Sequence, residues 1–383
     1  MSEPSVVDPQ ADDAPLAGVT VIEIEGELTP YAGRLLADLG AVVTRVGPVP
    51  TTSAPEPEEL YLHRGKHELP IDLSTQEGAA QLDSVLAATD VLLQSGGADA
   101  PAPESLAPAR IRATHPHLVH GVLTPFGLDG PRADWVSTDL VRLAAGGLLW
   151  LGGYPDTEPV APFGDQSTYA TAVFGAVGVL LALIDRDATG EGATVEVSSQ
   201  EVLTQALETS LPEFELTGKV RRRLGDVPRE AGTGIYPCSD GYVSMVAGRL
   251  GTAAAWRRLR EWLVEERIEG ADGLLRAEWE ELAHRQQPES IARFAEVFGV
   301  LAAARTKHDL YIEAQRRNIA LAPVNSPEEV LADRQLAARS YFVPTDDGRG
   351  GTVLFASPPY RFASPPPLER PAEPRPEPAA TVS

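Results

Sequence analysis

A long, nearly uncharged helical pattern between residues 163 and 184 constrains the fold of this chain more than any other stretch. No charged side chain occurs between Gln166 and Ile184. A helix that is apolar on all sides is a buried helix, so we expect this segment to lie in the core of a domain. The glycine turn at Gly190 and the apolar segment 195–198 then predict a short strand that follows the helix.

Asp165 stands at the start of this helix, between Gly164 and Gln166. The amino end of a helix carries a partial positive charge, which favours the ionised form of a carboxyl group. An aspartate at this position can be a helix N-cap or a nucleophile. The residue types alone leave both interpretations open.

Composition limits the classes of protein that this chain can belong to. Its 383 residues exceed one ordinary core, so we expect a larger and a smaller domain. The net charge of −23 argues against a nucleic-acid partner. The apolar runs predict no membrane span, and the amino-terminal segment lacks signal-peptide features. The single cysteine, Cys238, excludes a disulfide framework within the chain and a cysteine-based metal site. We therefore predict a cytoplasmic protein without a metal site.

The amino-terminal part of the chain predicts a parallel sheet. Residues 19–24 and 42–46 read as strands, and the segment from Pro30 to Leu39 between them reads as a helix. Such a strand–helix–strand unit implies parallel strands covered by helices. The loop between residues 24 and 30 has one glycine instead of G-x-G-x-x-G, which argues against a bound dinucleotide.

The rest of the chain predicts the domain plan. Later segments alternate between strand and helix patterns up to residue 198, and the following part is mainly helical, with Trp256, Trp262 and Trp279 as expected core residues. We therefore expect an α/β fold, with a large domain built on a parallel sheet and a smaller α+β domain. The predicted boundaries are a disordered start at 1–15, a large domain at 16–200, a linker at 201–224, a small domain at 225–325, a linker and return to the large domain at 326–363, and a disordered Pro-rich tail at 364–383.

Basic side chains are sparse in the first hundred residues and lie close together in the sequence. The first hundred residues contain four basic side chains, namely Arg34, Arg45, Arg64 and Lys66. If the protein binds an anion there, these residues are the ones that can hold it. The alternative is that they are ordinary surface charges.

Several segments together resemble one family. They are residues 15–24, residues 34–43, the His63-Arg-Gly-Lys66 motif, residues 189–198 and Ala322-Pro-Val-Asn325. In this order they resemble the class III CoA-transferases, the CaiB/BaiF family, which includes formyl-CoA transferase, carnitine CoA-transferase and α-methylacyl-CoA racemase. The resemblance covers residues 15 to 362.

The resemblance implies a fold and a ligand. The large domain would be Rossmann-like, and two subunits would interlock as a homodimer, with a heterodimer of two family members as the alternative. Coenzyme A would be a substrate with no permanently bound cofactor, and basic residues would hold its phosphates. Arg34 and Lys66 match family positions, whereas Gln94-Ser95 stands where the family has Glu-Asn. The expected CoA-binding residues are Arg34, Arg45, Arg64, Lys66 and Ser95.

The resemblance also implies a reaction. In the transferases an aspartate attacks an acyl-CoA thioester, and an aspartyl-CoA intermediate then passes CoA to a carboxylic acid. Asp165 is the expected nucleophile because it precedes the same apolar helix. The family's aspartate position, however, falls on Thr168, three residues later. A displacement of nearly one helical turn matters for catalysis.

Two other functions stay open. The threonine at position 168 would suit a CoA-binding subunit that lacks a nucleophile and pairs with a catalytic relative. An acyl-CoA racemase or isomerase is a further alternative. The racemase branch, however, has a histidine where this chain has Thr138, and an acid where this chain has residues 248–250.

Overall fold

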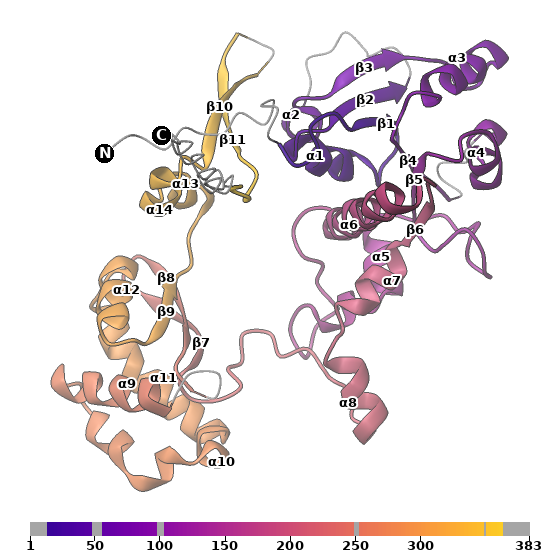
Figure 1. The fold of residues 1–383 in the computed structure, drawn as a ribbon. Coiled ribbons are helices and arrows are strands. Elements are labelled where there is room, and N and C mark those ends of the chain that lie inside the picture. Colours follow the sequence, from indigo (N-terminus) through magenta and orange to yellow (C-terminus); the bar gives the residue numbers. More distant parts are fainter. Residues whose placement is uncertain (1–13, 48–55, 98–102, 249–252, 348–349, 363–383) are drawn as a thin grey trace, which may run out of the picture.

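A computed structural model describes residues 14–47, 56–97, 103–248, 253–347 and 350–362. Two groups of elements stand apart in Figure 1, one around a six-stranded sheet and one around a three-stranded sheet. The first group holds the candidate site.

The six-stranded sheet is parallel throughout and has the order β3-β2-β1-β4-β5-β6. Its strands are β1 (Thr20–Ile24), β2 (Val42–Gly47), β3 (His67–Pro70), β4 (Val91–Ser95), β5 (Val119–Thr124) and β6 (Thr194–Ser198). Strands β4 and β5 are buried along their whole length, as expected for a parallel sheet with both faces covered. This is the strand order of a Rossmann-type sheet, and it confirms the α/β prediction.

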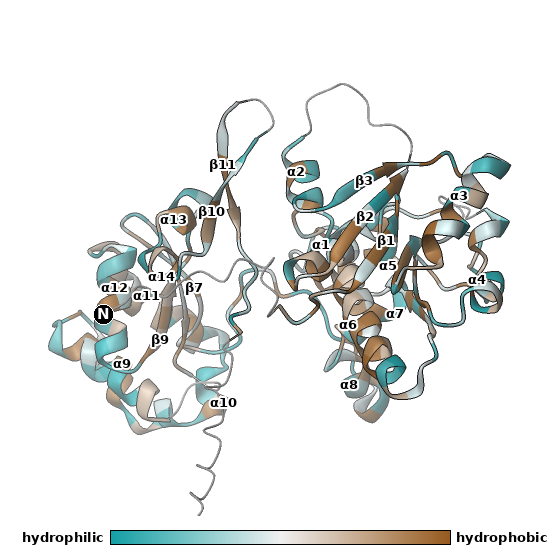
Figure 2. Cartoon of the chain, turned by 45° about the horizontal axis from the view of Figure 1, so that its top comes forward, coloured by the Kyte–Doolittle hydropathy of each residue, from teal (hydrophilic) through white to brown (hydrophobic). Residues whose placement is uncertain are grey.

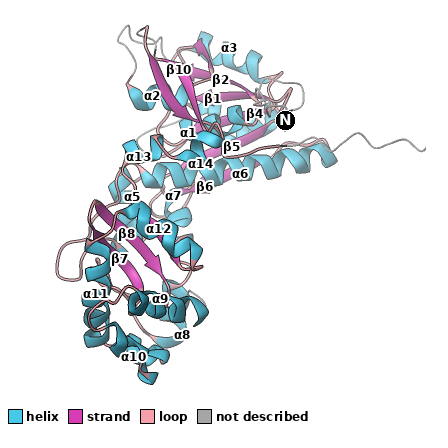
Figure 3. Cartoon of the chain, turned by 90° about the vertical axis from the view of Figure 1, so that its left-hand side faces the viewer, coloured by secondary structure: helices cyan, strands magenta, loops and turns pink. Residues whose placement is uncertain are grey.

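Helices cover both faces of the sheet because alternate strand residues point to opposite sides. Val21 and Leu93 pack with α1 (Pro30–Asp38) and α6 (Gln166–Thr189). Ile22 and Leu92 pack with α3 (Gln76–Leu86) and α4 (Pro108–Thr114) on the other side. Figure 3 shows α6 running along the bottom of this layered body.

Helix α6 is only half buried, contrary to the expectation of burial on all sides. Ala172, Gly175, Ala176 and Val179 are buried on its inner face, against β5, β6 and α1. Its outer face carries large exposed apolar side chains, which are Val173, Phe174, Val177, Leu181 and Ile184. The reason is geometric, because the sheet and the helices α1, α5 and α7 pack on one side of α6 and leave the other side uncovered. Figure 2 shows the apolar colouring of this helix.

By length and hydropathy α6 could cross a membrane. The prediction that no apolar run is long enough for a membrane span was therefore too strict. The helix has 24 residues and a mean hydropathy of 1.9 in its most apolar window, 39% of which is buried inside the protein. Its inner face packs on the sheet, as expected for a core helix of this type of fold.

Glycines allow α6 to lie close to the sheet. A Cβ atom at Gly178 would lie 2.6 Å from Cγ1 of Val195 on β6. A Cβ atom at Gly175 would lie 2.9 Å from Cδ2 of Leu123 on β5. These separations are shorter than carbon–carbon contacts allow, so the two glycines set the distance between helix and sheet.

Gly178→Ala is therefore expected to destabilise the protein, by about 1–3 kcal/mol, because the added methyl group overpacks the contact with a β-branched side chain. Gly299→Ala is the matched control. Gly299 also lies inside a helix, α11 (Pro288–Ala303), but a Cβ atom there would have no neighbour within 4 Å. That variant should be neutral or up to about 1 kcal/mol more stable. Urea denaturation measures both, and equal effects would contradict this view of α6 packing.

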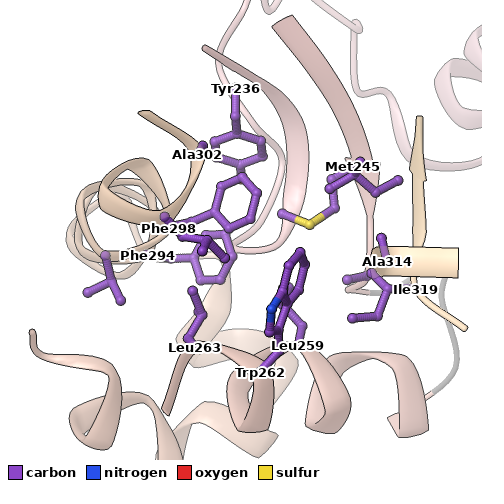
Figure 4. Packing of buried hydrophobic residues seen from close by; sticks show 14 of the residues in the cluster. Tyr236, Met245, Leu259, Trp262, Leu263, Phe294, Phe298, Ala302, Ala314 and Ile319 are labelled. Atoms are coloured by element: carbon purple, nitrogen blue, oxygen red, sulfur yellow. The ribbon is translucent and has the colours of Figure 1, made fainter. Parts of the chain in front are cut away.

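The second group of elements is an antiparallel sheet covered by helices. Its sheet has the order β7-β8-β9, with β7 (Thr233–Cys238), β8 (Gly241–Val246) and β9 (Ala320–Pro323). Its helices include α9 (Ala253–Glu265), α10 (Leu282–Arg285), α11 and α12 (Lys307–Arg316). Figure 4 shows the aromatic core, in which Phe294 and Phe298 stack beside Tyr236. Trp256, Trp262 and Trp279 are buried as predicted.

The remaining elements surround the large sheet or connect the two groups. They are α2 (Pro57–His63), α5 (Asp139–Ala145), α7 (Ser199–Gln205), α8 (Ser210–Thr217), α13 (Pro327–Leu331), α14 (Arg334–Ala338) and the hairpin of β10 (Phe342–Asp346) and β11 (Thr352–Ala356). Helix α5 ends at Ala145. Gly147 adopts a left-handed conformation, with φ of 83°, which interrupts the helix before Leu148.

The hairpin β10–β11 contacts the α2 segment (Figure 1). Arg64 Nη1 donates to Thr345 Oγ1 across 3.4 Å, and the ring of Tyr61 lies 5.8 Å from that of Phe355. The end of the described chain therefore contacts the segment that carries part of the basic cluster.

Candidate active site

The candidate site lies where the strand order of the large sheet reverses. Strands β1 and β4 are neighbours, and their connections leave in opposite directions along the sheet. The crevice outside the carboxyl ends of two such strands is the usual ligand site of an open α/β sheet. The backbone N–H of Leu28, in the loop after β1, donates to Ser95 Oγ at the end of β4, at 3.0 Å. Ser95 is thus buried against the loop after β1.

Arg142 of α5 is fully buried beside the crevice, and it holds Glu27 from the loop after β1. Its Nη1 and Nη2 atoms each donate to one oxygen of the Glu27 carboxylate, at 3.2 Å for Nη1. Its Nη2 also donates to Thr168 Oγ1 at 2.9 Å. The other two donors go to Ser167 Oγ at 2.8 Å and Ser137 Oγ at 3.1 Å. All five N–H groups of the guanidinium therefore have acceptors.

Asp139 fixes the start of α6 within the same cluster. Its Oδ1 accepts from the backbone N–H of Ser167 at 2.7 Å and from Ser167 Oγ at 2.6 Å. The carboxylate of Asp139 therefore accepts a hydrogen bond from one of the N–H groups at the amino end of α6 that have no partner within the helix. Ser167 in turn accepts from Arg142, so the start of α6 and the guanidinium are held as one unit.

Asp165 is the N-cap residue of α6, but its side chain makes no capping hydrogen bond. It is exposed to solvent. Partial burial, followed by the nearby charges of Asp139, Glu58 and Glu27, raises the pKa of Asp165, and the charge of Arg142 opposes this. Burial and neighbouring carboxylates therefore outweigh the effect of the helix end, which would favour the ionised form of Asp165.

The four basic residues expected to bind an anion do lie in one region. The charges of Arg34, Arg64 and Lys66 all act on Asp38, and those of Lys66 and Arg45 act on His63. Burial and then these two cations lower the pKa of His63 to about 3, so its imidazole is neutral at pH 7.

These basic residues differ in exposure and partners. Arg34 is buried, pairs with Asp38 at 2.9 Å and donates to the carbonyl of Tyr61 at 2.9 Å. Arg45 pairs with Glu68 at 3.4 Å, and its side chain is 18% exposed. Arg64 is half-buried, and burial and then the charge of Arg34 lower its pKa. Their role in binding CoA stays a prediction.

Lys66 is buried in an ion pair with Glu23 of β1. Its Nζ donates to the two oxygens of Glu23 at 2.9 and 2.7 Å and to the carbonyl of Pro30 at 2.7 Å. Its three donors are therefore used. Gly33 makes room for this pair, because a Cβ atom there would lie 1.7 Å from Glu23 Oε2. Burial outweighs the attraction of Lys66 and raises the pKa of Glu23 to about 7.

The sequence predicted Asp165 but missed Glu27 and Arg142. Thr168, noted from the sequence as standing at the aspartate position, is a partner of Arg142. The sequence feature that could have indicated this pair is Arg142 itself, a charged residue within the largely apolar segment DLVRLAA. A charge on the buried side of a helix requires a partner, but only the fold brings the loop after β1 to it.

Two observations concern other ligands. Within residues that the structure describes, no group of three or more His, Cys, Asp or Glu side chains could hold a metal ion. A cavity of about 450 Å³ lies away from the cluster, and its lining includes Tyr154, Arg221, Arg222 and Arg229. None of the candidate site residues lines this cavity, so we take the strand-end crevice as the candidate active site.

A family model described as CoA-transferase family III matches residues 16–378 of the chain. Among curated proteins, the chain is 31% identical to succinyl-CoA:(R)-benzylsuccinate CoA-transferase subunit BbsE of Thauera aromatica, over 89% of this chain and 87% of that protein. It is 27% identical to succinate–glutarate CoA-transferase of Agrobacterium fabrum, over 89% of this chain and 87% of that protein. It is 28% identical to α-methylacyl-CoA racemase of Mus musculus, over 86% of this chain and 82% of that protein.

Solved structures share the fold. A CaiB/BaiF family protein from Brucella suis matches with a TM-score of 0.76 and 22% identity, covering 91% of this chain and 93% of that one. Rv3272 from Mycobacterium tuberculosis matches with a TM-score of 0.73 and 21% identity, covering 91% and 93%. Both similarities extend over the large and the small sheet groups.

Proposed function

Because the chain belongs to CoA-transferase family III, we propose that it moves coenzyme A between an acyl-CoA thioester and a carboxylic acid. The family match over residues 16–378 carries this proposal. The carboxylates beside Arg142, at the crevice where α/β sheets bind ligands, support it. We further propose a cytoplasmic location, as the sequence predicts.

The proposed route is covalent. A carboxylate of the enzyme attacks the acyl carbon of the thioester, and the enzyme then holds CoA as a thioester of this carboxylate. The acceptor acid takes CoA from the enzyme by the same steps in reverse. In the form that the sequence predicts, Asp165 is this carboxylate and the intermediate is aspartyl-CoA. Its exposure at the start of α6 would let it reach a bound thioester.

We propose succinyl-CoA as the CoA donor. Several relatives are named for succinyl-CoA or succinate, including the subunit from Thauera aromatica and the enzyme from Agrobacterium fabrum. The region around Arg34, Arg45, Arg64 and Lys66 is the proposed site for the phosphates of CoA, because charge-assisted contacts are the strong ones for such groups. Arg45 and Arg64 are the half-buried arginines of this set, which leaves part of each side chain open to a ligand.

The proposal includes a dimer of two copies of this chain. Five large apolar side chains on the outer face of α6 are 41–68% exposed in the single chain. Such a continuous apolar face on a soluble enzyme fold favours a subunit contact. In the interlocked arrangement that the resemblance implies, the second copy would cover it.

Trapping the enzyme-bound thioester tests the proposal. The purified full-length protein is incubated with succinyl-CoA and then with hydroxylamine, and its mass is compared with that of protein treated without the thioester. The expected result is a covalent CoA adduct that hydroxylamine converts to a hydroxamate on a carboxyl side chain. Transfer of CoA to an added acid without any adduct would contradict the covalent route.

A second function is favoured by Thr168, which stands at the family's aspartate position. The chain could be a CoA-binding subunit that pairs with a catalytic family member. Relatives named as alpha and beta subunits of succinyl-CoA–L-malate CoA-transferase, from Chloroflexus aurantiacus, share 27% identity with it. An inactive purified protein that becomes active only when co-expressed with a second family member would support this function. An active homodimer would argue against it.

A further inference from the structure

We infer that Glu27, anchored by Arg142, is the carboxylate that takes up CoA in this protein. This inference rests on the proposed transferase function and specifies its nucleophile. It places the reacting carboxylate in the loop after β1, whereas the sequence places it at Asp165.

The contacts of Arg142 carry the inference. The guanidinium binds Thr168, which stands at the family's aspartate position, and the same Nη2 atom binds a carboxylate oxygen of Glu27. Two acceptors of one Nη2 atom lie close to each other, since both are within hydrogen-bond distance of it. The Glu27 carboxylate therefore lies beside the hydroxyl of Thr168. A carboxylate missing from residue 168 is thus supplied from another segment of the chain.

The position of Glu27 suits a nucleophile. Its side chain is 53% exposed, while the Arg142 side chain that anchors it is fully buried. The guanidinium of Arg142 is therefore fixed, and the carboxylate of Glu27 is open to a ligand. Glu27 also follows β1 directly, at the reversal point of the strand order.

Asp165 has a weaker environment for the same task. No capping hydrogen bond fixes its side chain at the helix start. Burial and then three nearby carboxylates raise its pKa, and the charge of Arg142 opposes them. A nucleophilic carboxylate has to be ionised and oriented. Two hydrogen bonds from Arg142 orient the carboxylate of Glu27.

The chemistry balances without any additional reactant. An oxygen of Glu27 attacks the acyl carbon, the carbon–sulfur bond breaks, and CoA leaves as a thiolate. The thiolate then attacks the Glu27 carbonyl carbon of the mixed anhydride, which releases the acyl group as a carboxylate. The product is a glutamyl-CoA thioester, and the acceptor acid reverses the two steps.

Arg142 gains a second role in this scheme. Once Glu27 is a thioester it has no charge, so the buried guanidinium loses its counter-ion. A buried unpaired charge is costly, and a carboxylate substrate beside Arg142 would restore the balance. The intermediate therefore favours binding of an acid over water at this position.

The test locates the trapped carboxyl group. Full-length protein is treated with succinyl-CoA and hydroxylamine and digested, and the hydroxamate is assigned by tandem mass spectrometry. We expect it at Glu27. A hydroxamate at Asp165 would overturn this inference and leave the proposed function intact. A protein that forms no hydroxamate and transfers no CoA would overturn both.

Variants separate chemistry from folding. Glu27→Gln keeps an oxygen for Arg142, yet it should lose the adduct and lower turnover by about 10³-fold or more. Glu25→Gln, in the same loop and exposed, is the matched control and should keep both. Adding Thr168→Asp to Glu27→Gln returns a carboxylate to the same guanidinium and should restore the adduct, now at position 168. Full activity in a folded Glu27→Gln protein would contradict the inference.

Discussion

Lys66→Met is expected to destabilise the large domain by about 3–5 kcal/mol, because it leaves the buried carboxylate of Glu23 without its partner. Glu23 is fully buried and Lys66 is 1% exposed in its side chain, so water cannot replace the lost ammonium group. Chemical denaturation at pH 9, where Glu23 of the folded wild-type protein is ionised, measures the effect. CoA binding is measured separately on the folded fraction, because the sequence also assigns Lys66 to phosphate binding.

The ion pair of Lys66 and Glu23 also makes the stability of the protein depend on pH. The pKa of Glu23 is about 7 in the folded protein, against an ordinary value of 4.5. Between these values the folded state holds a proton that the unfolded state has released, so stability falls as the pH rises from 4.5 to 7. The loss over this window is roughly 3 kcal/mol. In Lys66→Met the pKa rises further, and the fall in stability continues to higher pH.

The double variant Glu23→Gln/Lys66→Met is the control. Without either charge, the site needs no ion pair, and most of the lost stability should return. The fall in stability between pH 4.5 and 7 that arises from Glu23 should also disappear. A Lys66→Met protein as stable as the wild type at pH 7 and above would show that the pair is not buried as described.

Leu181→Glu is expected to convert the proposed dimer into monomers, with the dimer dissociation constant raised about 100-fold or more. Leu181 is 63% exposed at the centre of the outer face of α6. A dimer that buries this side chain gains about 2 kcal/mol from it. Placing a carboxylate there adds the cost of burying an unpaired charge. Sedimentation velocity over a concentration series measures the change.

Leu275→Glu provides the matched control for this experiment. Leu275 is 47% exposed on the helical side of the small sheet group, away from α6. The same substitution there should leave the oligomeric state unchanged. A wild-type protein that is monomeric at all concentrations would contradict the homodimer, and one that dimerises only with a second family member would support the heterodimer.

Local sequence patterns predicted most of the large fold. Apolar strands, the Thr29-Pro30 helix start and the glycine after the first helix specify β1, α1 and β2 through short-range rules. The same holds for the buried tryptophans of the small sheet group. Burial of α6 was overestimated, because hydropathy reports whether a face is apolar and not whether the same chain covers it.

The candidate site was predicted only in part, because its contacts join distant segments. Glu27 and Arg142 are 115 residues apart in the sequence. No local rule relates a glutamate after a strand to an arginine in a later helix. Lys66 was identified as a basic residue, but its partner Glu23 was hidden within an apolar strand pattern. Asp165 as nucleophile stays a prediction that the trapping experiment can decide.

The hairpin of β10 and β11 has a consequence for how the protein is made. The contact between Arg64 and Thr345 spans 281 residues of sequence. During synthesis the large sheet can therefore form early, while this edge of the basic cluster stays open until residue 345 has left the ribosome. Contacts of such separation close late in folding. A nascent or truncated chain would thus carry a folded sheet but lack the contact at Arg64. If CoA binds at the proposed site, its binding would then depend on completion of the polypeptide.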